Sequence, residues 1–171
     1  MRKSFVRYLP YCGVIAAATF IFTTINFTVP IVNTKGCLVH LGAAMAVAVV
    51  FMLPPVYGAL SVALGMAMYD IIGGWTMWSP FTFVIRFLQV FVLAKMINRP
   101  THKTLFAVIG FILAMIIDVG GYYMAEVIIY GNWIAPFANV PAEIILNAVG
   151  IALGLPAGLM LKKTKLARNI Q

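Results

Sequence analysis

The chain has 171 residues, of which 63% are hydrophobic and 9% charged, and its mean hydropathy is +1.02. A soluble domain carries about 25% charged residues, so this chain has too little polar surface to face water. The composition excludes a soluble enzyme and predicts one integral membrane domain over residues 1–171. At roughly 20 apolar residues per transmembrane helix, the length allows six spans joined by short loops.

The net charge of +8 comes from short clusters of basic residues rather than from a continuous basic face. Nucleic-acid binding needs such a face with aromatic residues between the charges, so no nucleic-acid partner is expected. Basic clusters beside apolar segments instead mark the cytoplasmic side of a membrane protein. The clusters are Arg2, Lys3 and Arg7; Lys95, Arg99 and Lys103; and Lys162, Lys163, Lys165 and Arg168.

Apolar runs predict an all-α membrane protein with six transmembrane helices, at about residues 8–27, 39–53, 57–73, 80–97, 105–130 and 141–161. The second and third runs meet at Pro54 and Pro55, where a helix is interrupted because proline lacks an N–H and restricts the residue before it. We therefore expect a tight helical hairpin there. An even number of spans puts both termini on the cytoplasmic side, together with all three basic clusters.

The predicted outer loops are residues 28–38, 74–79 and 131–140, and they contain all three tryptophans, Trp75, Trp78 and Trp133. Two interpretations are open. Tryptophan is enriched where a membrane meets water, so these residues fit an interfacial belt. They also fit a lid over a pocket that opens outward.

All four acidic residues and Arg86 fall within or at the ends of the predicted spans. Each such charge costs about 2.5–3.5 kcal/mol on insertion scales, so it should face the helix bundle and have a partner or a function. We expect a structural ion pair between Asp70 and Arg86. Ligand contact is favoured for Glu126 and Glu143, because no basic residue remains nearby to neutralise both.

Helical spacing gathers the polar residues onto three faces, one of which carries Asp118, Tyr122 and Glu126 at four-residue intervals. Three polar faces near the outer side predict a small-molecule pocket with a few oriented polar groups in an apolar wall. For His40, ligand contact and an interfacial position at a helix start are both open. The predicted substrate-binding residues are Asn33, His40, Trp78, Phe81, Arg86, Tyr122, Glu126, Glu143 and Asn147.

The sequence shows no nucleotide-binding loop, no pair of histidines at metal-ligand spacing and no nucleophile elbow. We therefore expect no catalytic residue, no metal site and no cofactor in this chain. One hypothesis is a solute-capturing subunit that is powered by other polypeptides. The alternative is a stand-alone carrier with Asp118 or Glu126 as a proton site, although the internal repeats of many such carriers are not evident.

Small residues recur at four-residue spacing in three of the predicted spans. Such ridges let helix backbones approach closely in lipid. They serve either packing within the bundle or docking onto another membrane subunit. The candidate docking positions are Gly13, Ala17, Ala59, Ala63, Gly150 and Gly154.

Four ordered segments, residues 35–44, 53–60, 67–74 and 79–82 with Arg86 after them, resemble the substrate-binding S components of energy-coupling factor (ECF) vitamin transporters. The similarity is greatest to the branch for riboflavin, pyridoxine and hydroxymethylpyrimidine. One departure is Ala43, where many relatives carry an aspartate after His-Leu-Gly.

The resemblance implies a non-enzymatic protein of the prokaryotic plasma membrane that captures a vitamin at its outer face. Its implied partners are a transmembrane T component and two ATPase subunits that hydrolyse ATP. The resemblance also places Gly13 and Ala17 at the family's docking pair on the first helix. The acids and aromatic residues favour a neutral or weakly cationic aromatic ligand, with pyridoxine first, hydroxymethylpyrimidine second and riboflavin third.

Overall fold

The computed structural model describes residues 2–29 and 37–164, so the predicted site residue Asn33 lies outside the described residues. The elements, in chain order, are α1 (Arg2–Thr24), β1 (Asn26–Val29), β2 (Cys37–His40), α2 (Gly42–Ala48), the 3₁₀ turn η1 (Val49–Phe51), α3 (Pro55–Ile72), α4 (Ser79–Ile97), α5 (Lys103–Tyr130), the 3₁₀ turn η2 (Ala135–Ala138) and α6 (Val140–Lys162).

The protein is a helical membrane protein in which α3, α4, α5 and α6 are long and apolar enough to cross a bilayer. The expected second span, residues 39–53, instead forms the end of β2, helix α2 and η1. Together α2 and η1 form an apolar segment of ten residues, Gly42–Phe51. At about 1.5 Å per residue this covers roughly half of the hydrocarbon core. Helix α3 begins at Pro55, which agrees with the predicted break.

A short antiparallel hairpin, which the all-α prediction did not include, joins α1 to α2. Strands β1 and β2 pair in the register Asn26 with His40 and Phe27 with Val39. Asn26 also donates a hydrogen bond from Nδ2 to the Tyr69 hydroxyl at 2.7 Å, which ties the hairpin to α3. The pairing fixes His40 at the end of β2, two residues before α2 begins, where its side chain is buried.

Helix α2 is buried because glycines of α6 let the two backbones approach closely. A Cβ on Gly154 would collide with the Ala44 carbonyl oxygen, and one on Gly150 would lie 3.0 Å from the Ala43 carbonyl oxygen. Ala59 and Ala63 on α3 are also fully buried. These four candidate docking positions are thus occupied by packing within the chain, the first of the two interpretations of the small-residue ridges.

Gly13 and Ala17 on α1 differ, because both are exposed on the described structure. A Cβ on Gly13 would have no heavy atom outside its own helix neighbourhood within 4 Å. Helix α1 contacts α3 through another face, where Gly65 lies against the Ala16 carbonyl oxygen. The α1 ridge of Gly13 and Ala17 is therefore not used in packing by the described part of the chain.

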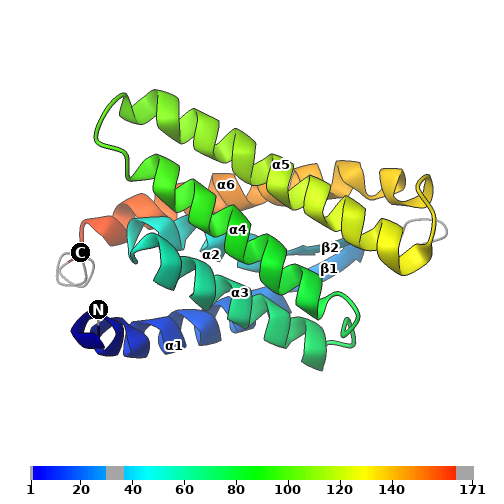
Figure 1. The fold of residues 1–171 in the computed structure, drawn as a ribbon, viewed down its shortest axis with the longest axis horizontal. Coiled ribbons are helices and arrows are strands. Elements are labelled where there is room, and N and C mark those ends of the chain that lie inside the picture. Colours follow the sequence, from blue (N-terminus) through cyan, green and yellow to red (C-terminus); the bar gives the residue numbers. More distant parts are fainter. Residues whose placement is uncertain (1, 30–36, 165–171) are drawn as a thin grey trace.

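The long helices run back and forth between two ends of the molecule, which lie at the left and the right of Figure 1. One end, called here the basic end, holds the start of α1, the α4–α5 connection and the end of α6, which carry Arg7, Lys95, Arg99, Lys103 and Lys162. The other end, called the cavity end, holds the hairpin, the α3–α4 connection and η2. Between them, Val49, Val62 and Val90 are fully buried and form part of the hydrophobic core. Packed apolar side chains therefore lie between the basic end and the cavity end.

Candidate functional site

A polar cavity of about 50 Å³ lies at the cavity end. One water needs about 10–15 Å³ of such space, so the cavity has room for only a few waters, and a larger ligand would have to widen it. The lining combines charged, aromatic and aliphatic side chains, which come from β2, α3, the α3–α4 connection, α4, α5 and α6. These residues are Leu38, His40, Asp70, Trp75, Trp78, Thr82, Arg86, Tyr122, Glu126, Glu143 and Leu146.

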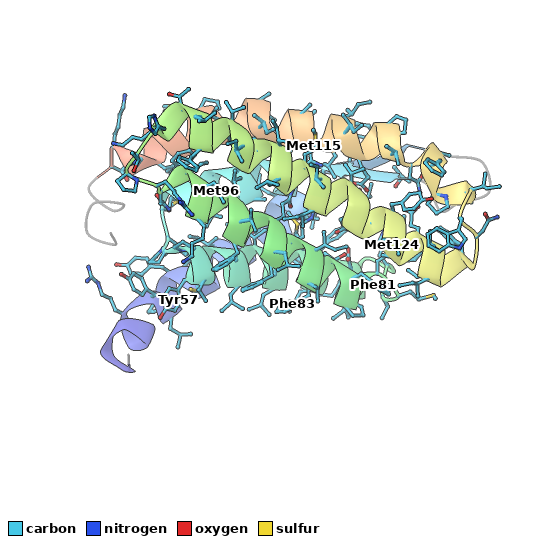
Figure 2. All side chains as sticks on the ribbon, turned by 45° about the horizontal axis from the view of Figure 1, so that its top comes forward. Tyr57, Phe81, Phe83, Met96, Met115 and Met124 are labelled. Atoms are coloured by element: carbon cyan, nitrogen blue, oxygen red, sulfur yellow. The ribbon has the colours of Figure 1, made fainter. Side chains whose placement is uncertain are left out.

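The structure brings most of the predicted substrate-binding residues together at this cavity. Six of them line it: His40, Trp78, Arg86, Tyr122, Glu126 and Glu143. Phe81 lies near the start of α4 at the same end but does not line the cavity (Figure 2). Asn147 is buried and does not line it either, because its amide is used in a network beside Arg86.

That network is a closed polar ring made of Arg86, Gln89, Asp118 and Asn147, which joins α4, α5 and α6. Arg86 Nη1 lies 2.7 Å from Asp118 Oδ1 and donates to Gln89 Oε1 at 2.8 Å. Gln89 Nε2 donates to Asn147 Oδ1 at 3.0 Å, and Asn147 Nδ2 donates to Asp118 Oδ2 at 2.6 Å. Every member is buried, so these contacts replace hydrogen bonds to water that the four side chains have lost.

Arg86 therefore forms its ion pair with Asp118, and the expected pairing with Asp70 is corrected. The side chains of Arg86 and Asp118 are only 2% and 0% exposed. Depth along each helix could be estimated from sequence, but the relative rotation and tilt of α4 and α5 could not. Tyr122 covers the guanidinium, with its ring centroid 5.1 Å from the Arg86 Cζ atom.

Asp70 faces the cavity from the end of α3. Thr82 lines the cavity beside it, and its hydroxyl oxygen accepts a hydrogen bond from the Tyr122 hydroxyl at 3.0 Å. Asp70 Oδ2 and Arg86 Nε are buried and have no hydrogen-bond partner among the described residues. A buried polar group without a partner is costly, so these atoms are available for groups of a ligand.

Glu126 and Glu143 form the acidic wall on the other side. The two carboxylate oxygens of Glu126 each accept a hydrogen bond from Asn139 Nδ2 at 2.6 Å. Glu143 lies in the first turn of α6, where the helix dipole favours a negative charge. Asn139 was not predicted, because its effect depends on η2 folding back over the end of α5.

His40 lies in β2, outside the membrane-spanning helices, and lines the cavity. Burial lowers the pKa of His40 to about 3, and the positive charge of Arg86 lowers it further in the same direction. The imidazole is consequently neutral at physiological pH. Its Nδ1 atom is buried without a partner among the described side chains. A neutral imidazole can donate or accept there, according to its tautomer.

Two of the three tryptophans cover the cavity. Trp75 and Trp78 line it and lie edge-to-face, with ring centroids 5.4 Å apart. Trp78 also contacts Tyr130 at 6.1 Å between ring centroids. Trp133 is 61% exposed and does not line the cavity. The lid interpretation therefore fits Trp75 and Trp78, and the interfacial interpretation fits Trp133.

Sequence reasoning missed Asp70, Trp75 and Thr82 as members of the lining. A signal for each was present, because Asp70 is an acid inside a predicted span, Thr82 lies one helical turn before Arg86, and Trp75 lies in a predicted outer loop that fitted a lid. Leu38 and Leu146 gave no signal, since apolar residues are common throughout this chain. No cluster of three or more potential metal ligands occurs within residues 2–29 and 37–164.

The fold and the site define a helical membrane protein with a small polar cavity at one end. A family model for the S component of ECF-type riboflavin transporters matches residues 3–163, and the chain belongs to that family. The family consists of transporter components and is not a class of enzymes. The chain is also similar to an uncharacterized protein of Pyrococcus woesei, with 29% identity over 143 residues, which cover 82% of this chain and 93% of that protein.

Proposed function

We propose that this chain is the substrate-capture subunit of an ATP-driven vitamin importer in the plasma membrane of a prokaryote. The observation that carries the proposal is the polar cavity, in which Asp70, Arg86 and His40 each keep an atom that has no hydrogen-bond partner among the described residues. Trp75 and Trp78 line the same cavity. Buried polar groups of this kind favour a ligand that supplies the missing hydrogen bonds. The basic end would face the cytoplasm and the cavity end the outside.

The proposed ligand is a small aromatic vitamin or precursor that is neutral or weakly cationic. Tyr122, Trp75 and Trp78 offer aromatic faces, and the acidic wall accepts hydrogen bonds from hydroxyl or ring N–H groups. Pyridoxine, hydroxymethylpyrimidine and riboflavin are the candidates, and the description of the matched family names riboflavin. Each of them is larger than the cavity volume of about 50 Å³, so we expect Trp75 and Trp78 to move on binding.

Transport would be driven by partners, namely an ECF T component and two ATPase subunits that hydrolyse ATP. The exposed α1 ridge of Gly13 and Ala17 is the proposed contact with the T component. Its small side chains would allow close approach of a partner helix within the membrane. This arrangement needs no cofactor in the chain itself.

The test is purification of the chain, binding measurements with the three candidate ligands, and reconstitution into liposomes. We expect tight binding of one ligand by the chain alone, and uptake only after the T component and ATPases are added with ATP. Uptake by the chain alone, driven by a pH gradient, would instead identify a proton-coupled carrier. Absence of binding to all candidates would contradict the proposed function.

A further inference from the structure

The positive charge of Arg86 at the cavity is neutralised by Asp118, which lies behind it and outside the cavity lining. Arg86 lines the cavity, whereas its partner Asp118 does not. The 2.7 Å ion pair is buried, with Asp118 fully out of contact with solvent, and the second Asp118 oxygen accepts a hydrogen bond from Asn147. Asp118 is therefore held against Arg86 independently of the ligand.

We propose that Asp118 determines ligand specificity by making the site reject anionic, phosphorylated forms of its ligand. The inference rests on the proposed function and specifies the ligand class of the same site. A buried guanidinium without a partner carboxylate attracts phosphate strongly, because it donates two parallel charged hydrogen bonds. With Asp118 in place, Arg86 offers its remaining donors to an uncharged acceptor such as a carbonyl or hydroxyl oxygen.

The other charged groups at the cavity are acids, and they also disfavour an anionic ligand. Asp70, Glu126 and Glu143 line it, and Arg86 is its only cationic side chain in the described part of the chain. A phosphate ester would bring two negative charges toward three acids, in a site where little water screens them. Only an unneutralised Arg86 could offset this repulsion, so the state of the Arg86–Asp118 pair decides the discrimination.

The polar ring fixes the carboxylate that performs this function. Asn147 uses its Oδ1 to accept from Gln89 and its Nδ2 to donate to Asp118 and to the Glu143 carbonyl oxygen. Gln89 in turn accepts from Arg86. Asn147 and Gln89 are thus positioning residues, since they hold Asp118 and Arg86 in register and do not line the cavity.

The experiment compares two matched pairs of probes, riboflavin with riboflavin 5′-phosphate and pyridoxal with pyridoxal 5′-phosphate, by calorimetry on the purified chain. We expect the pair whose unphosphorylated member binds to show at least about 100-fold weaker binding of the ester. The discrimination ratio is the dissociation constant of the ester divided by that of the unphosphorylated ligand. Asp118→Asn should lower this ratio by at least about tenfold, because Arg86 is then free to bind phosphate.

The double variant Arg86→Gln with Asp118→Asn is the matched control, because it lacks the same acid but leaves no buried unpaired guanidinium. It should restore the wild-type ratio, although affinity for the unphosphorylated ligand falls. A ratio that stays narrowed would show that Arg86 is not responsible and would overturn the proposal.

If Asp118→Asn does not fold, the wild-type protein and the double variant still decide the question. Equal affinities of the wild-type protein for a ligand and its phosphate ester would overturn the inference, as would loss of discrimination in the double variant. Binding of an unphosphorylated vitamin in the same experiment would leave the proposed function intact. Failure of both pairs, together with hydroxymethylpyrimidine, would contradict the proposed function itself.

Discussion

Helices α1 and α6 carry the same pattern of small residues at four-residue spacing, yet they use it differently. On α6, Gly150 and Gly154 lie against the backbone of α2 and are buried. On α1, Gly13 and Ala17 are exposed, and Gly13 has open space where a Cβ would be. The pattern alone therefore indicates close helix approach, but not whether the approaching helix belongs to the same chain.

The comparison distinguishes a surface that is buried by the chain itself, on α6, from surfaces that are available to another molecule, on α1 and in the cavity. The α2–α6 contact has no room for a further atom at Gly154. The α1 ridge and part of the polar cavity, by contrast, find no partner within residues 2–29 and 37–164. Substitutions in the first region should damage the fold. Substitutions in the others should spare the fold and damage an interaction with another molecule.

The largest expected effect is a loss of folding stability caused by Gly154→Leu. The new side chain would collide with the Ala44 carbonyl oxygen and Val47, so α6 would be pushed away from α2. We expect a loss of about 3 kcal/mol in stability or failure to fold, as for a severely overpacked site. Thermal unfolding in detergent measures it. Gly120→Leu on α5, where a Cβ meets nothing within 4 Å, is the control and should leave stability nearly unchanged.

Gly13→Leu combined with Ala17→Leu tests the open ridge. Both side chains would project from an exposed face, so we expect an unchanged melting temperature and ligand affinity within about twofold of wild type. Assembly should be lost, because bulky residues keep a partner helix away. Co-purification with the T component and ATPases is the measurement. Normal complex formation would show that this ridge is not the docking surface.

Glu126→Gln tests the acidic wall of the cavity. If the carboxylate accepts a charge-assisted hydrogen bond from the ligand, its loss should weaken binding by about tenfold or more. Calorimetry measures the effect, with the melting temperature as a check on folding. Tyr123→Phe is a control on the same helix, since that hydroxyl donates to the Trp133 carbonyl oxygen and does not line the cavity. Unchanged affinity of Glu126→Gln would remove this residue from the site.

The smallest expected effect is a pH dependence of stability that comes from His40, which is buried and lines the cavity. Its pKa is about 3 in the folded protein and 6.5 in the unfolded chain. As the pH falls from 6.5 toward 3, the unfolded state binds a proton that the folded state does not, so stability decreases by up to about 1.4 kcal/mol per pH unit. His40→Gln should be less sensitive to acid than wild type between pH 7.5 and 5. Parallel pH profiles would contradict the burial of a neutral imidazole.

The polar faces of α4 and α5 were predictable, because the helical period places Arg86 near Thr82 and Glu126 near Tyr122 whatever surrounds them. The partner of Arg86 was not. Asp70 and Asp118 both satisfied the requirement for an acid within the membrane, and only the rotation of α5 against α4 selects Asp118. Asn147 illustrates the same point, since its helix face was foreseen but its contact with Asp118 rather than with the cavity was not.

The sequence by itself determined the membrane class, the break at Pro54 and Pro55, and the inward direction of the charged residues, because these follow from hydropathy, backbone chemistry and the cost of charge in lipid. Only the tertiary structure decided that residues 39–53 form a strand end and a short buried helix, which glycine on α6 accommodates. It also decided which ridge is internal and which acid neutralises Arg86. Both depend on how helices rotate and pack against one another, and each helix carries several faces that are equally compatible with its own sequence.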